Sequence, residues 1–204
     1  MARGTAKKRE IQRDALIDAA ERRIAEAGLS ALKARDLAAE VGCAVGALYS
    51  LVADMDEIVL RVGSRTLARL DVALGECGAA TRAATPEDRL VAVALAYADF
   101  AADNLPLWRA MFEHRLAEGR EVPDWSVREQ MALFGHVDAP LRALLPDLAE
   151  AERHLLARAL FSAVHGIVAL GLEGKLVAVP REALARQIEL VVRASARGLV
   201  GSRE

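Results

Sequence analysis

Basic side chains gather at the start of this 204-residue chain, where they are suited to binding phosphate groups. Residues 1–35 hold nine basic and five acidic side chains, a net charge of +4, whereas the whole chain carries −2 and the remainder therefore −6. Such an asymmetry places an attractive potential for polyanions at one end of the molecule. A solvated basic tail would have the same composition, so the structural elements that carry these charges decide between the two interpretations.

The sequence lacks the common patterns of catalytic and metal-binding residues. None of the four histidines has a glutamate three residues before it, which excludes the Glu-x-x-His pairs of di-iron helical bundles. Gly-x-Ser-x-Gly, His-Glu-x-x-His, Gly-x-Gly-x-x-Gly and the phosphate loop are also missing. Cys43 and Cys77 are not a close-spaced metal pair, and we expect both to be reduced. We therefore predict no enzyme activity, no metal site and no cofactor.

The stretch from Lys33 to Ile58 has the pattern of two short helices joined by a tight turn. Apolar residues recur at helical spacing between residues 34 and 41, and Gly42 then supplies the positive φ that ends a helix. Residues 43–50 follow at once and are long enough for only about two turns. Two helices joined by a short glycine-containing turn form a helix-turn-helix, whose second helix can lie in the major groove of DNA.

In this order and spacing, the residues resemble the DNA-binding domain of the tetracycline-repressor-like (TetR) transcriptional regulators. The resemblance covers roughly residues 10 to 62. Its elements are Gly28, the run Arg35-Asp36-Leu37-Ala38, Val41-Gly42, Gly46, Leu48-Tyr49 and Asp56-Glu57-Ile58. The later segment 160–166 also resembles the WHG signature of one C-terminal subfamily, with Val164 where tryptophan is usual.

The resemblance implies which residues contact DNA. Lys33, Arg35 and Tyr49 fall at positions that contact the DNA backbone, while the residues facing the groove come from the recognition helix. The implied contact residues are Lys33, Arg35, Ala44, Val45, Gly46, Ala47, Tyr49 and Ser50. Like other helix-turn-helix proteins, the chain would bind as a two-fold dimer to a pseudo-palindromic operator in double-stranded DNA.

The predicted recognition helix and the residues after it, up to the opening of the fourth helix, depart from the usual family pattern. Ala44-Val45 replaces a serine-lysine pair, Val52 replaces an aromatic residue and Met55 replaces a lysine. Because residues 44–50 contain no arginine, asparagine or glutamine, none of them can make bidentate hydrogen bonds to guanine or adenine. We expect apolar contacts with thymine methyl groups instead, with basic side chains near the N-terminus binding phosphate or the minor groove. Those basic side chains are Arg3, Lys7, Lys8 and Arg9.

The composition favours an all-α fold. Hydrophobic residues make up 53% of the chain and aromatic residues only 4%, and no apolar stretch reaches the roughly 18 residues of a transmembrane helix. The N-terminus lacks the apolar core of a signal peptide, so we expect a cytoplasmic protein. Helical periodicity predicts a helix at 9–27 and another at 54–77, the second with a capping box formed by Asp54 and Glu57.

The expected organisation is a helix-turn-helix domain at residues 1–53, braced by the helix at 54–77. Residues 54–204 would form a ligand-sensing and dimerisation domain, a bundle that brings the total to about nine helices. Further helices are expected at about 86–104, from Pro106, at 123–145 with an interruption near Gly135 and Pro140, at about 146–172, and from Pro180.

The two helices near residues 148–172 and 180–199 resemble the pair with which the family forms a four-helix homodimer interface. An internal core without a partner would show the same apolar pattern. Candidate ligand-binding residues lie in the helices between the DNA-binding domain and these two, and within the first of the two: Trp108, Met111, Phe112, Phe161 and His165. Ordinary core packing is the alternative for each of them.

These expectations describe a ligand-responsive transcriptional repressor that binds operator DNA as a homodimer and responds to a largely apolar small molecule. The alternative is a helical interaction module that has lost DNA binding, because the recognition helix lacks the usual lysine.

Overall fold

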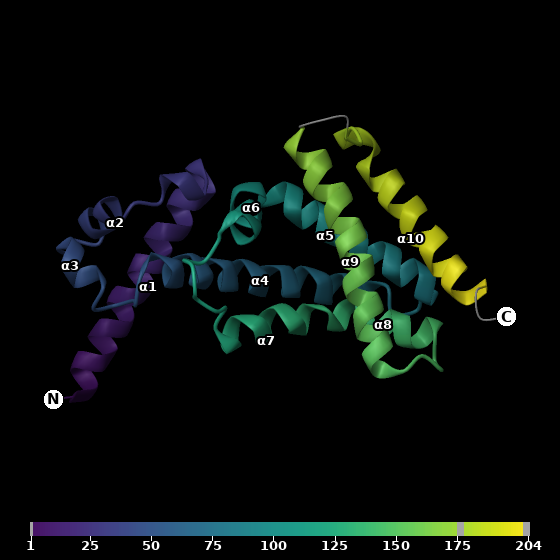
Figure 1. Ribbon diagram of the computed structural model, residues 1–204, viewed down its shortest axis with the longest axis horizontal. Helices are drawn as coiled ribbons and strands as arrows, with labels where there is room; N and C mark the ends of the chain where they lie inside the picture. Colours follow the sequence, from purple (N-terminus) through teal and green to yellow (C-terminus); the bar gives the residue numbers. More distant parts are fainter. Residues whose placement is uncertain (1, 175–177, 202–204) are drawn as a thin grey trace. The chain divides into compact units, whose positions relative to one another are not determined.

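The computed structural model describes residues 2–174 and 178–201, with side chains from residue 6 onward, and all regular elements in these ranges are helical (Figure 1). It contains ten α-helices in these ranges, which confirms the predicted all-α class. The chain forms two compact units. The first unit consists of Met1–Leu67 and Asn104–Val127, and the second of Ala68–Asp103 and Arg128–Glu204.

Most of the first unit comes from the N-terminal third of the chain. It contains α1 (Ala2–Ala27), a 3-10 helix (Leu29–Ala31), α2 (Ala34–Glu40), α3 (Val45–Leu48), the first half of α4 (Met55–Ala80) and α6 (Leu105–Glu113). Helix α1 begins well before Arg9, where periodicity placed its start. The added turns are rich in alanine, lysine and arginine, which favour helix intrinsically and need no apolar stripe.

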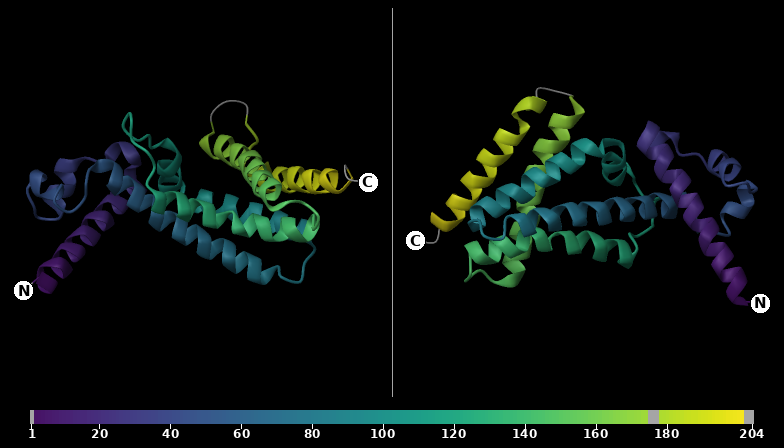
Figure 2. Two further views of the ribbon diagram at one scale, coloured as in Figure 1. Left: turned by 60° about the horizontal axis from the view of Figure 1, so that its bottom comes forward. Right: turned by 180° about the vertical axis from the view of Figure 1, so that it is seen from behind.

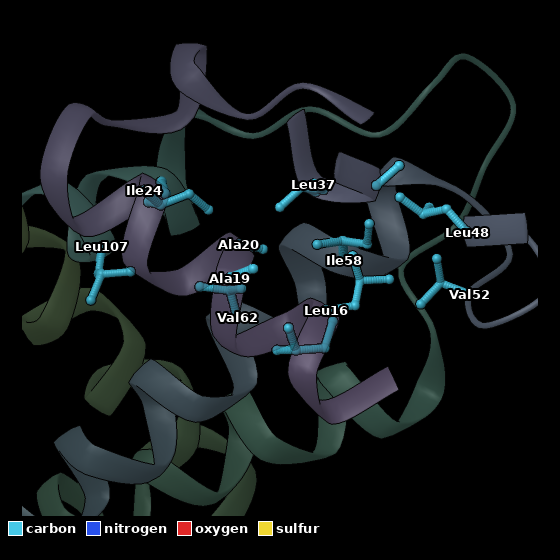
Figure 3. Packing of buried hydrophobic residues seen from close by; sticks show 13 residues of the cluster. Leu16, Ala19, Ala20, Ile24, Leu37, Leu48, Val52, Ile58, Val62 and Leu107 are labelled. Atoms are coloured by element: carbon cyan, nitrogen blue, oxygen red, sulfur yellow. The ribbon is translucent and has the colours of Figure 1, made fainter. Parts of the chain in front are cut away.

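A single apolar cluster holds the first unit together (Figure 3). Leu16 and Ile24 of α1 are fully buried, as are Leu37 of α2, Leu48 of α3 and Ile58 of α4. The remaining buried members are Ile17, Ala19, Ala20, Ala38, Val52, Val62, Leu107 and Ala110. Each helix thus contributes its apolar stripe to one shared core, which stabilises helices that are too short to be stable alone. Helix α6, distant in sequence, belongs to this core.

The second unit contains α5 (Pro86–Asp103), α8 (Gly135–Leu144), α9 (Glu150–Glu173), a 3-10 helix (Arg181–Ala183) and α10 (Leu184–Gly201). Helix α10 packs against α5 and α9, and α8 packs against the same two helices (Figure 2). Close approach of α9 to the start of α10 depends on a glycine. A Cβ atom at Gly171 would lie 3.1 Å from Leu184 Cγ and closer still to a Leu184 methyl group.

The interruption predicted near Gly135 divides the segment 123–145 into two helices, whereas the one predicted near Pro140 is not found. Helix α7 (Asp124–Leu133) ends before Phe134, and α8 starts at Gly135 and contains Pro140 without interruption. Pro140 is the sixth residue of α8, so it cannot donate the hydrogen bond that the carbonyl of His136 would otherwise accept within the helix. Two other starts were placed too early, since α9 begins at Glu150 and the last helix opens with a 3-10 turn at Arg181.

Candidate nucleic-acid interface

Helices α2 and α3 form the expected helix-turn-helix. Gly42 has φ 70°, a left-handed conformation that glycine adopts without a Cβ penalty, and the Cys43 N–H donates to Ala38 O at 2.9 Å. Helix α3 is shorter than predicted, with only four residues. Of these four, Leu48 alone is buried, so one leucine anchors the helix while its other residues face outward.

All eight residues predicted to contact DNA are exposed on the first unit: Lys33, Arg35, Ala44, Val45, Gly46, Ala47, Tyr49 and Ser50. Two of them are large hydrophobic side chains that lie outside the core, since Val45 is 39% and Tyr49 46% exposed. The arrangement meets the first requirement of a recognition helix, which is access to its side chains. The DNA contacts themselves stay a prediction.

The charges near this surface divide into paired and free groups. Arg22 and Arg23 on α1 each donate to a different oxygen of Glu40 on α2 at 2.8 Å, and Arg23 also lies 3.7 Å from Asp36. The hydrogen bonds from Arg22 and Arg23 hold the pKa of Glu40 below its usual range. These two arginines therefore serve the α1–α2 contact, and the count of basic residues in the sequence overstated the charge available for phosphate.

Four other cations near this surface are free. Lys7, Lys8, Lys33 and Arg35 make no hydrogen bond or ion pair with any residue in the described ranges, and all four are exposed. They can bind phosphate without breaking a contact in the protein.

Arg9 has a different environment from its basic neighbours. Its guanidinium donates to the backbone carbonyl of Ser50, just beyond the end of α3. The side chain of Arg3, also predicted to bind DNA, lies outside the described side chains. Arg9 therefore joins α1 to the end of the recognition helix, a contact that spans 41 positions and leaves no periodic signal in the sequence.

The start of α4 carries a variant of the predicted capping box, in which the Glu57 side chain accepts from the N–H of Ala53 and not from that of Asp54. The Glu57 N–H donates to Asp54 Oδ1 at 2.8 Å, and the Ala53 N–H donates to Glu57 Oε2 at 2.6 Å. Although burial opposes ionisation, the hydrogen bonds from Ala53 and Arg61 lower the pKa of Glu57. The capping box thus holds a charged carboxylate at the positive end of α4.

A segment that follows α6 is fastened to the same helix start. His114 Nε2 lies 3.3 Å from Asp56 Oδ1, the Ala117 N–H donates to Asp56 Oδ2 at 3.4 Å, and Arg120 donates to Asp54. These contacts leave no pattern in the sequence, because their partners lie about sixty positions apart. Their effect is to connect α6 to the helix that follows the helix-turn-helix.

Comparisons with known proteins match both parts of the chain. Residues 16–62 match the bacterial regulatory proteins of the tetR family, and residues 90–194 match the tetracyclin repressor-like C-terminal domain. The chain belongs to the TetR family. This confirms the resemblance seen in the sequence and supports a DNA-binding regulator. A comparison with curated protein sequences finds no match.

Several solved structures resemble the chain along most of its length. A protein of unknown function from Rhodococcus sp. RHA1 is 21% identical with a TM-score of 0.69, covering 90% of this chain and 94% of that one. The putative regulatory protein SCO4313 is 19% identical with a TM-score of 0.71, covering 93% and 98%. PfmR, a TetR family transcriptional regulator from Thermus thermophilus, is 20% identical with a TM-score of 0.56, covering 89% and 94%. At these identities the similarity establishes the fold.

The predicted ligand-binding residues of this TetR family member fall into two groups, one in each unit. In the first unit, Trp108 is buried, Met111 is partly buried and Phe112 is exposed on α6, with the rings of Trp108 and Phe112 5.1 Å apart. In the second unit, Phe161 and His165 lie on α9, with their rings 5.5 Å apart.

The α9 group includes a polar pair that the sequence analysis did not single out. The Tyr97 hydroxyl lies 2.7 Å from His165 Nδ1, and the Tyr97 ring meets Phe161 edge-on at 5.4 Å. Burial lowers the pKa of His165, which favours a neutral imidazole beside the phenol. A neutral pair of this kind can hydrogen-bond an uncharged polar group on an otherwise apolar molecule.

Helices α9 and α10 expose large apolar side chains. Leu155 and Leu170 on α9 are 59% and 49% exposed, and Leu190 on α10 is 61% exposed. An 18-residue stretch of α9 has a mean hydropathy of 1.8, and only 22% of this stretch is buried. By length and composition alone α9 could cross a membrane, but the core helix of a soluble protein has the same length and composition. The exposed small residues between the leucines include Ala159, Ser162 and Ala163, which permit close helix approach.

Proposed function

We propose that this protein is a ligand-responsive transcriptional repressor that binds a pseudo-palindromic operator as a homodimer. The observation that carries the proposal is the outward presentation of α3, which is anchored by Leu48 while Val45, Ala47 and Tyr49 stay exposed. These exposed side chains take no part in the core that Leu48 joins, whereas major-groove contact requires their exposure.

Phosphate contacts would set the register of the protein on the duplex, and methyl contacts would supply part of the specificity. Lys33, Arg35 and Tyr49 are placed for the backbone, and Lys7 and Lys8 on α1 extend the basic surface. The methyl groups of Ala44, Val45 and Ala47 would pack against thymine methyl groups.

The proposed dimer interface consists of the exposed faces of α9 and α10. Their leucines are separated by small residues, a pattern that lets two copies of each helix pack closely, and a two-fold interface pairs the same patch on both subunits. The same two-fold symmetry would present two copies of α3 to successive major grooves about one helical turn apart.

We propose that residues 1–53 act as the DNA-binding domain and residues 54–204 as the domain for effector binding and dimerisation. Helix α4 is shared by both units, and its start is fastened to the segment after α6 through Asp54 and Asp56. A largely apolar effector near Trp108, Met111 and Phe112, or near Phe161 and His165, would change DNA binding only if it prefers one arrangement of these elements. We further propose that the protein is cytoplasmic and has no catalytic activity.

Selection of bound sequences from random double-stranded DNA tests the proposal. The expected result is an enriched pseudo-palindrome whose affinity falls steeply as salt concentration rises. Enrichment of no sequence, with equally weak binding to all DNA, would favour the alternative of an interaction module that has lost DNA binding.

A further inference from the structure

Ser50 is held by its neighbours at three points, and only the lone pairs of its hydroxyl oxygen are left for another molecule. Its N–H donates to the carbonyl of Ala47 at 3.0 Å, and its hydroxyl donates to the same carbonyl at 2.6 Å. Its own carbonyl accepts a hydrogen bond from Arg9. A serine hydroxyl whose proton is already donated can only accept a further hydrogen bond.

Few other polar side-chain atoms on or beside α3 could form hydrogen bonds with bases. Ala44, Val45, Gly46 and Ala47 carry no polar side-chain atom, and Tyr49 has the other hydroxyl in the segment 44–50. Ser50 itself is exposed at the end of the helix. Any hydrogen-bonded base discrimination by the recognition helix therefore depends mainly on one acceptor oxygen.

The major groove contains only two kinds of donor that such an oxygen can meet. Adenine presents the N6 amino group and cytosine the N4 amino group, whereas guanine N7 and O6, thymine O4 and the phosphate oxygens are all acceptors. To donate to one of these acceptors, the Ser50 hydroxyl would have to rotate and give up its 2.6 Å hydrogen bond to the Ala47 carbonyl, which costs free energy. While its proton stays on the Ala47 carbonyl, the Ser50 hydroxyl oxygen therefore favours bases that carry an amino group in the major groove.

Arg9 keeps this oxygen in place. A four-residue helix cannot hold its own end rigidly, and a cation that donates to the carbonyl just after it stabilises both that carbonyl and the negative end of the helix. Arg9 would therefore act on DNA recognition through Ser50 and need not contact phosphate as its neighbours Lys7 and Lys8 do.

We infer that Ser50 is a specificity-determining residue that selects adenine or cytosine at one position of each operator half-site, with Arg9 as its positioning residue. This inference rests on the proposed operator binding and names the base chemistry that one side chain reads.

Selection from random double-stranded DNA with the wild-type chain, Ser50→Ala and Ser50→Thr tests the role of Ser50. The wild type is expected to enrich adenine or cytosine at one position per half-site. Ser50→Ala should lose the preference at that position alone and bind the wild-type operator about threefold to tenfold more weakly per half-site. Ser50→Thr keeps a hydroxyl that can donate to the same turn and should retain the preference.

Arg9→Ala and Lys8→Ala separate positioning from phosphate binding. Arg9→Ala should relax the same base position as Ser50→Ala while leaving the dependence of affinity on salt unchanged. Lys8→Ala should leave base preference intact and reduce the slope of log affinity against log salt by about 0.9 for each phosphate that the protein no longer neutralises. Circular dichroism and melting temperature confirm that each exposed-site variant is folded.

Two results would overturn the inference without touching the proposed function: an operator whose bases are unaffected by Ser50→Ala, or guanine or thymine at the position that Ser50→Ala relaxes. A reduced salt slope for Arg9→Ala with unchanged base preference would remove Arg9 from its positioning role. If the wild type enriched no sequence, the proposed function would fail and this inference with it.

Discussion

Asp138 on α8 accepts a hydrogen bond from Arg153 Nε on α9 at 2.6 Å, and both residues are buried, with exposed fractions of 7% and 6%. The other carboxylate oxygen of Asp138 accepts from Arg142 at 3.0 Å. Removing one partner of a buried ion pair leaves an uncompensated charge, which costs more than the pair itself contributes. This pair therefore holds α8 and α9 in one arrangement.

Asp138→Asn is expected to lower the free energy of unfolding by about 3 kcal/mol, because Arg153 stays charged and buried without its counter-ion. Urea unfolding at neutral pH measures the change. Glu152→Gln on the exposed face of α9 is the control and should change stability by less than about 0.5 kcal/mol. An equal loss of unfolding free energy in the two variants would show that the buried ion pair stabilises the fold no more than an exposed carboxylate does.

The same carboxylate should make stability depend on pH in the acid range. Although burial opposes ionisation of Asp138, the hydrogen bonds from Arg153 and Arg142 lower its pKa below the usual range. The unfolded state then binds more protons than the folded state, so this contribution is present above about pH 4 and is lost as pH falls further. The stability difference between wild type and Asp138→Asn should shrink over that window in urea titrations. A difference that stays constant would contradict the lowered pKa.

Two helix glycines should respond in opposite directions to alanine. A Cβ at Gly171 would lie 3.1 Å from Leu184 Cγ and closer to a methyl group, so Gly171→Ala is expected to destabilise by about 1–3 kcal/mol through overpacking. A Cβ at Gly63 would meet Met111 Cγ at 3.7 Å, an ordinary contact, and Gly63→Ala should stabilise by about 0.5–1 kcal/mol through helix propensity. Thermal melting distinguishes the signs, and a stabilising Gly171→Ala would refute the close approach.

Lys33→Ala and Arg35→Ala should weaken DNA binding to a similar extent for all sequences. Each phosphate that a variant no longer neutralises reduces the slope of log affinity against log salt by about 0.9. Arg22→Ala removes a cation that is already paired with Glu40 at 2.8 Å and is the matched control. Mobility-shift titrations at several salt concentrations provide the slopes. A control slope that falls as much as the other two would mean that net charge, and not the free cations, sets the affinity.

Leu155→Glu and Leu190→Glu should convert a dimer into monomers, because a carboxylate at a two-fold apolar interface is buried without a partner. Val72→Glu on α4 is the control, since Val72 is 59% exposed, as is Leu155. Sedimentation analysis gives the oligomeric state, and far-ultraviolet circular dichroism confirms the fold. A wild-type chain that sediments as a monomer would remove the proposed interface.

Much of this protein could be predicted from local patterns alone. Apolar periodicity predicted the helices, Gly42 marked the turn of the helix-turn-helix, and the three-residue spacing of Asp54 and Glu57 predicted the capping box. These features depend on residues within one or two turns of each other, so their spacing along the chain is sufficient to specify them. The exposure of the six predicted DNA-contact residues in the segment 44–50 likewise follows from Leu48 being the apolar anchor of that segment.

Tertiary structure alone decided which charges are free, how short the recognition helix is and which distant segments join the first unit. The pairing of Arg22 and Arg23 with Glu40, the bond from Arg9 to Ser50 and the contacts of Arg120 and Ala117 near the start of α4 all join distant positions. An ion pair or hydrogen bond between distant residues has no period in the sequence, because it arises only when packing of the apolar stripes brings the two helices together. Periodicity thus determined the helices, and their packing determined which polar groups are satisfied within the protein and which are left for DNA.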